Sequence, residues 1–159
     1  MTLPDIPRGG TFGEEETLNR YGCTGKNKSP AIKWHGAPSG TRSFLISRFD
    51  VDSETSSGFW HRSAWNIPAS THSLPAGTVA PGDPGLPAPA VLGRSDFGET
   101  GYGGACPPPG DRAQRYVFTV VALATADLDV PQDLPMAAVN VVMREHALAA
   151  GHRTVVFGR

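Results

Sequence analysis

A chain of 159 residues has room for one hydrophobic core, because two independent cores would leave each half marginal in size. Hydrophobic residues make up 39% of the chain and charged residues 18%, with a formal net charge of −1, which argues against a disordered protein and against a nucleic-acid partner. No apolar run approaches the roughly 20 residues that cross a bilayer, and residues 1–10 lack a secretory pattern. The sequence predicts a single cytoplasmic domain over residues 1–159.

Segments rich in β-branched and aromatic residues, each bounded by Gly, Pro, Ser or Asp, predict strands. They cover residues 31–35, 42–50, 60–67 and 115–125. The last of these is apolar on both faces, which is typical of a strand in the middle of a sheet. The domain is therefore expected to be mainly β.

A long stretch rich in proline and glycine covers residues 68–110, with turn-forming runs at 81–85 and 107–110. We expect most of it to be ordered loop. Long loops inside a compact domain are uncommon and usually functional, so the functional site is expected to border this one.

The C-terminal region predicts a helix followed by a strand. Apolar residues spaced by three and four favour an amphipathic helix over residues 135–150, which begins on a proline and stops at Gly151. Residues 153–158 predict a last strand, so the chain would end in the sheet.

The cysteines and histidines show none of the spacings that are typical of metal sites. Cys23 and Cys106 are far apart in sequence and form no CxxC pair, so two free thiols are expected in a reducing cytosol. The five histidines have no HxxxH spacing, and neither a metal nor a cofactor is predicted.

Two acidic residues and one histidine are the first candidates for chemistry. Asp50 and Asp52 would face the same side if their strand continued, where paired carboxylates bind a cation or share a proton, although this pattern is also common in turns. His61 follows aromatic residues that would desolvate its imidazole. It fits a general base or an anion ligand, and it fits a structural histidine equally well.

A glycine-rich loop and an arginine complete the candidates. Residues 101–106 lack the lysine of a phosphate-binding P-loop, so a turn is favoured, although backbone amides in such turns can hold an anion. Arg115 could pair with Asp50 or Asp52, or it could meet an anionic ligand. The pairing within the protein is favoured.

Several separated motifs follow one another in a specific order. They read NKSP (27–30), PSGTRSF (38–44), DVD (50–52), GFWH (58–61), NIP (66–68), GYGGACPPPGD (101–111) and QRY (114–116). In this order they resemble the phosphatidylethanolamine-binding protein family, also called Raf kinase inhibitor-like proteins, and its bacterial branch in particular. The resemblance covers most of the chain.

The resemblance implies a fold of two antiparallel sheets with a C-terminal helix, and a homodimer. It also implies a small pocket for phosphate-like or carboxylate-like groups, or for another small polar organic ligand. The ligand-binding residues implied are Asp50, Asp52, Phe59, His61, Tyr102, Pro107, Pro108, Gln114 and Arg115.

The chain departs from the family pattern at three positions. Gln114 stands where the family usually has a second pocket histidine, and a neutral amide gives roughly 1 kcal/mol per hydrogen bond against about 1.5–3 kcal/mol for a charged donor. Val51 replaces a proline and Arg62 replaces a tryptophan. Arg62 could restore the lost positive charge, but alternation along a strand would point it away from His61.

Three functions follow from these observations. The first is a binding or regulatory domain with an anion or small-ligand pocket. The second is an acid–base isomerase or cyclase in the same pocket, with His61 or Asp50 as the base and Gln114 as a neutral donor. The third is an interaction protein that acts through its surface. The loss of the second histidine favours a ligand other than phosphate.

Overall fold

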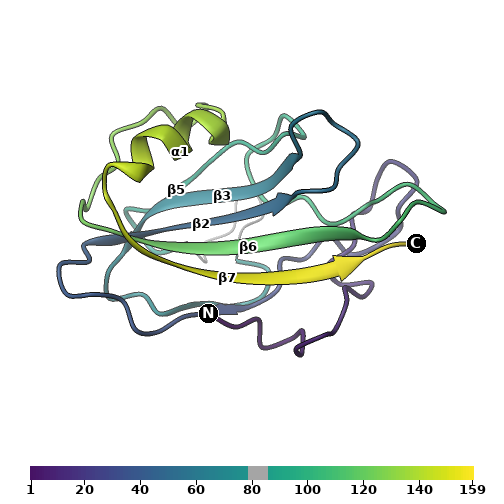
Figure 1. Cartoon of the computed structure of the whole chain (residues 1–159), viewed down its shortest axis with the longest axis horizontal. Coiled ribbons are helices and arrows are strands. Elements are labelled where there is room, and N and C mark those ends of the chain that lie inside the picture. Colours follow the sequence, from purple (N-terminus) through teal and green to yellow (C-terminus); the bar gives the residue numbers. More distant parts are fainter. Residues whose placement is uncertain (79–85) are drawn as a thin grey trace.

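A five-stranded antiparallel sheet forms the centre of the computed structural model, which describes residues 1–78 and 86–159 (Figure 1). Its strands, in spatial order, are β5 (Val91–Leu92), β3 (Phe59–Pro68), β2 (Ser43–Asp50), β6 (Gln114–Leu123) and β7 (Ala147–Phe157). A smaller antiparallel sheet pairs β1 (Ile32–Lys33) with β4 (Ser73–Leu74). The predicted mainly β fold with two antiparallel sheets is confirmed.

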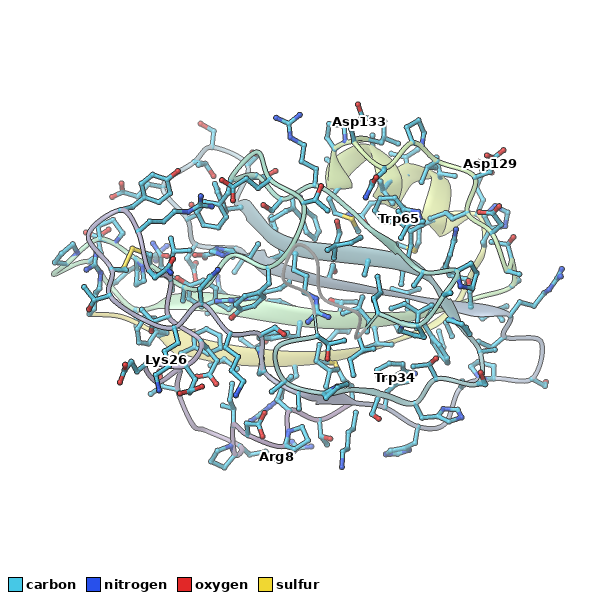
Figure 2. The ribbon with its side chains drawn as sticks, turned by 180° about the vertical axis from the view of Figure 1, so that it is seen from behind. Arg8, Lys26, Trp34, Trp65, Asp129 and Asp133 are labelled. Atoms are coloured by element: carbon cyan, nitrogen blue, oxygen red, sulfur yellow. A yellow bond between two sulfur atoms is a disulfide. The ribbon has the colours of Figure 1, made fainter. Side chains whose placement is uncertain are left out.

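The large sheet is covered on both faces, so the inner strands are apolar on both sides. On one face, Trp34 and the N-terminal segment pack over Phe44 and Ile46. On the other face, Leu45 and Trp65 pack beneath the helix. Figure 2 shows Trp34 and Trp65 on opposite sides of the sheet. Successive side chains along β2 therefore pack into two separate hydrophobic cores, one on each face of the sheet.

Most of the predicted strands form close to their expected positions. The segment predicted at 115–125 is β6, which lies inside the sheet between β2 and β7, as its apolar faces indicated. The strand predicted at 31–35 is shorter, because β1 pairs over two residues only.

The helix predicted over residues 135–150 is too long, and that prediction was wrong at its C-terminal end. Helix α1 covers Met136–Arg144 and packs against the sheet through Met136 and Val139, near one end of the sheet (Figure 1). Strand β7 then begins at Ala147 and pairs with β6 along its whole length. The alanines at 147–150 favour a helix, but pairing with β6 satisfies their backbone groups and prevails over that local preference.

The described residues between 68 and 110 form two short strands, β4 and β5, and ordered loops, as expected. The predicted turn at 81–85 lies outside the described residues. The turn at 107–110 is fixed to the C-terminus, because the Gly110 amide donates to the Arg159 carbonyl at 2.9 Å.

The two cysteines form a disulfide, so the prediction of two free thiols was wrong. Their Cα atoms are 6.0 Å apart, and Figure 2 shows the sulfur–sulfur bond. Backbone hydrogen bonds join the two segments nearby, since Leu18 donates to Ala105 and Ala105 donates to Glu16. Because the two cysteines are 83 residues apart, the sequence gives no local sign that they are close in space.

The described residues include no helix with the length and apolar character that a membrane span needs.

Candidate functional site

A cavity of about 270 Å³ lies where β2 ends and where β3 and β6 begin. In an antiparallel sheet the last residue of β2 meets the first residues of β3 and β6, and Asp50 indeed pairs with Phe59 on one side and Tyr116 on the other. Loops supply the remaining walls. The lining consists of Leu18, Tyr21, Asp50, Ser53, Glu54, Thr55, Phe59, His61, Phe97, Cys106, Pro108, Gln114 and Tyr116.

His61 is held in the cavity wall by the backbone of a glycine loop. A β-bulge makes it the extra residue of β3 opposite the step from Arg48 to Phe49, and its ring lies 5.4 Å from the ring of Tyr116. The Nδ1 atom is 2.9 Å from the carbonyl oxygen of Gly103. A carbonyl only accepts hydrogen bonds, so Nδ1 carries the proton and Nε2 keeps its lone pair.

The environment of His61 keeps its imidazole uncharged. The residue is 4% exposed. Burial lowers the pKa of His61 well below its usual 6.5 and the nearby Arg48 charge lowers it further, while hydrogen bonds with Gly103 and Gly104 oppose both effects. Near neutral pH, His61 is therefore a hydrogen-bond acceptor rather than a cation.

Asp50 is a buried carboxyl group with a hydrogen-bonded neighbourhood. Its Oδ1 accepts the backbone amide of Asp52 at 3.0 Å. Burial raises the pKa of Asp50, and the hydrogen bond from the Asp52 amide and the charge of Arg48 oppose that rise. Burial also raises the pKa of Tyr116, which remains a neutral phenol.

Gln114 provides a neutral donor beside these groups. The Tyr116 hydroxyl donates to Oε1 of Gln114 at 3.1 Å, which leaves the Gln114 amide NH₂ to donate. Gln114 and Tyr116 are two residues apart on β6, so they face the same side of the sheet.

The structure separates the predicted site residues into two groups. Asp50, Phe59, His61, Pro108 and Gln114 surround the cavity. Outside its lining lie Asp52, Tyr102, Pro107 and Arg115.

Asp52 and Arg115 form an ion pair beside the cavity, which is the pairing that the sequence favoured. Arg115 Nε is 2.7 Å and Nη2 is 2.8 Å from the Asp52 carboxylate, and Arg112 adds a contact at 3.3 Å. Hydrogen bonding to Arg115 lowers the pKa of Asp52 to about 2. Strand β2 ends at Asp50, so Asp52 does not share its face.

Tyr102 and Pro107 lie outside the cavity lining and make hydrogen bonds within the surrounding protein. Tyr102 accepts a hydrogen bond from Arg48 at 2.5 Å and donates one to the Glu16 carbonyl at 3.2 Å. The carbonyl oxygen of Pro107 accepts a hydrogen bond from Nε of Arg159 at 2.6 Å.

Sequence reasoning missed several lining residues. Tyr116 could have been found, because it follows Gln114 at the spacing of one strand face. Leu18, Tyr21 and Phe97 come from loops that long-range contacts position, and the sequence carries no local signal for them. Arg62 lies outside the lining, buried in the sheet beside Arg48. Within residues 1–78 and 86–159, no three His, Cys, Asp or Glu side chains gather to hold a metal ion.

Known proteins are similar to this chain in sequence and in fold. UPF0098 protein YbcL of Escherichia coli strain K12 is 38% identical over 99% of this chain and 86% of that protein. UPF0098 protein YbhB of the same strain is 38% identical over 96% of each chain.

Solved structures agree with this relationship. The crystal structure of E. coli YbcL, described as a new member of the mammalian PEBP family, has a TM-score of 0.95 at 37% identity and covers 99% of this chain and 96% of the other. A PEBP homologue from Chlamydia trachomatis, CT736, shares the fold with a TM-score of 0.72 at 21% identity, covering 97% of this chain and 95% of the other. The family model described as "Phosphatidylethanolamine-binding protein" matches residues 8–158. With nearly the whole chain matched, this protein belongs to the phosphatidylethanolamine-binding protein family.

Proposed function

We propose that this protein is a binding domain that holds a small polar organic molecule in the cavity at the end of β2, β3 and β6. The molecule donates hydrogen bonds to His61 and Asp50 and accepts one from Gln114. The observation that carries the proposal is that His61 and Gln114 face one cavity as a neutral acceptor and a neutral donor.

The charges of the lining support a ligand with a hydroxyl or amine group over a bare phosphate. Asp50 and Glu54 line the cavity, and its described lining contains no lysine or arginine. A phosphate would therefore lack the charged donors that make its hydrogen bonds strong. An ammonium group would instead meet the Asp50 carboxylate and the His61 lone pair.

The aromatic walls suit the carbon skeleton of such a ligand. Phe59 and Phe97 pack edge to face with ring centroids 4.7 Å apart, and Phe97 stacks with Tyr21 at 6.1 Å. Aromatic faces also attract cations, which adds to the preference for an amine. Small-molecule pockets commonly combine apolar walls with a few polar groups in this way.

Titration by NMR with ethanolamine, O-phosphorylethanolamine and acetate tests the proposal. We expect saturable shifts with ethanolamine, lost in His61→Ala and kept in the control Arg112→Gln, whose side chain is 81% exposed and outside the lining. Gln114→His should improve binding of O-phosphorylethanolamine about tenfold, because it permits a charged donor. Binding of O-phosphorylethanolamine and acetate by the wild type, without binding of ethanolamine, would contradict the proposal and favour an anion pocket.

An acid–base isomerase or cyclase is the second candidate. Burial raises the pKa of Asp50 and lowers that of His61, and pairs of groups shifted in this way suit proton transfer. Turnover of a cavity-sized substrate, followed by mass spectrometry, would support an enzyme if Asp50→Asn abolished turnover and left binding intact.

A homodimer is a further part of the proposal. β7 is an outer strand of the large sheet, and its side chains Leu148 and Val156 are exposed. Unpaired strand edges readily accept a second chain. Light scattering on the purified protein measures its mass in solution, and a monomer at all concentrations would exclude the dimer.

The Cys23–Cys106 disulfide gives information about the cellular compartment in which the protein folds. Cytosolic thiols are kept reduced, whereas disulfides persist in oxidising compartments. We therefore infer that Cys23–Cys106 favours an oxidising compartment over the cytoplasm that the sequence predicts. Alkylation of thiols in intact cells distinguishes the two, because only reduced cysteines take the label.

A further inference from the structure

Two arginines are buried side by side in the large sheet. Arg48 on β2 and Arg62 on β3 are directly opposite in the strand register, and they are 0% and 1% exposed. Directly opposite residues in an antiparallel pair place their side chains on the same face. The sheet thus carries two neighbouring guanidinium groups inside the protein, and neither belongs to the cavity lining.

Arg48 is only partly satisfied. Its Nη1 donates to the hydroxyl of Tyr102 at 2.5 Å and to the carbonyl of Gly103 at 3.2 Å. Its Cζ lies 4.5 Å from the ring centroid of Phe12 and 4.7 Å from that of Tyr116. Nε and Nη2 are buried without a hydrogen-bond partner among the described residues.

Arg62 has fewer hydrogen-bond partners than Arg48 among the described residues. All three of its guanidinium nitrogens are buried and find no acceptor in the part of the chain that the structure describes. The two acidic residues that are buried in that part, Asp50 and Glu16, form no ion pair with either arginine.

Within residues 1–78 and 86–159, no negative charge pairs with these two arginines. Burying a cation without an anion is costly, and two adjacent cations also repel each other. Loss of a proton does not solve the problem, because burial lowers the pKa of Arg62 only to about 9 and the group stays charged at pH 7. Buried polar groups in folded proteins find a partner, which can be a bound ion.

We propose that Arg48 and Arg62 form an internal binding site for one small monovalent inorganic anion, such as chloride. Five buried guanidinium nitrogens without a partner in the described residues, two on Arg48 and three on Arg62, are available to donate to it from neighbouring strands. Aromatic rings within 5.5 Å of the Arg48 Cζ leave little room, which favours an ion of atomic size over a phosphate or an organic acid. This site stabilises the fold and is separate from the proposed ligand cavity.

Thermal unfolding at constant ionic strength tests the site, with sodium chloride replaced stepwise by sodium gluconate. A bound anion raises Tm with the logarithm of its concentration, by roughly 3–5 °C for each tenfold increase above its Kd. We expect this dependence in the wild type and in the exposed control Arg112→Met. Arg62→Met should lose it.

Anomalous diffraction provides a second measurement that needs no variant, in case Arg62→Met fails to fold. Crystals of the wild type grown in sodium bromide should show a bromide peak within hydrogen-bond distance of both guanidinium groups. Equal Tm values in chloride and gluconate, an unchanged chloride dependence in folded Arg62→Met, or no bromide between the arginines would each overturn the proposal.

Discussion

Arg48 and His61 donate hydrogen bonds to the same acceptor, the carbonyl oxygen of Gly103, at 3.2 Å and 2.9 Å. The shared carbonyl fixes the imidazole proton on Nδ1, so Nε2 remains an acceptor. The charge of Arg48 also lowers the pKa of His61, after burial the largest cause. A buried arginine behind the cavity thus helps to set which hydrogen bonds the cavity can make.

Substitution of Arg48 by Met should raise the pKa of His61. The variant removes one of the two effects that lower this pKa, but burial remains, so the value should stay below 6.5. NMR of the imidazole resonances across a pH titration measures it, and Arg115→Met, which changes a guanidinium bound to Asp52, is the matched control. An unchanged His61 pKa in Arg48→Met would show that the charge of Arg48 does not act on His61.

Stability should fall as the pH decreases below about 6.5. The unfolded chain protonates His61 near this pH while the folded protein does not, so the unfolded state binds more protons. One such group contributes a slope of up to about 1.4 kcal/mol per pH unit. Urea unfolding at several pH values from 7.5 to 5 measures it. His61→Gln should flatten the curve, whereas the surface variant His152→Gln should not.

Arg115→Met should lower Tm without weakening ligand binding. The substitution removes the two side-chain bonds to Asp52. Because the Arg115 side chain is 59% exposed, and Arg112 and the Arg115 backbone amide still bind Asp52, the loss should be at most roughly 2–4 °C. The pKa of Asp52 is lowered to about 2, so its contribution is present above 3.8 and disappears as the pH falls through 2. Calorimetry at pH 7 and pH 2 measures this contribution. A large loss of ethanolamine binding in Arg115→Met would show that Arg115 belongs to the ligand site.

Reduction of the disulfide should destabilise the protein by about 2–5 kcal/mol, because the bond closes a loop between residues 83 apart. Urea unfolding with and without a phosphine reductant measures the difference. The double variant Cys23→Ser/Cys106→Ser should be insensitive to the reductant. Since Cys106 lines the cavity, ligand affinity should fall in the same samples. Identical curves would mean that the loop is held by its backbone hydrogen bonds alone.

The sequence predicted the sheet well because its strands carry strong local signals. Residues 42–50 and 60–67 alternate or stay apolar between clear turn residues, and they form β2 and β3. The end of α1 could not be predicted, since the alanines that follow it pair with β6 only in the folded protein.

The cavity was predictable where strand ends supply it. Asp50, His61 and Gln114 stand at motif positions that the sheet brings together. Tyr21 and Phe97 were not predictable, because loop packing and the disulfide position them. Arg48 was overlooked, although alternation with Phe44 and Ile46 places it on a core-facing position.

The Cys23–Cys106 bond has a mechanical consequence. If the two ends of the chain are pulled apart, the segment between Cys23 and Cys106 cannot extend, because the disulfide joins its ends. With a sequence separation of 83 in a chain of 159 residues, about half of the polypeptide is shielded from the force. The shielded part includes β2 and β3 together with most of the cavity walls, while β6, α1 and β7 carry the load. Under tension only residues 1–22 and 107–159 could extend, unless the sulfur–sulfur bond were reduced beforehand.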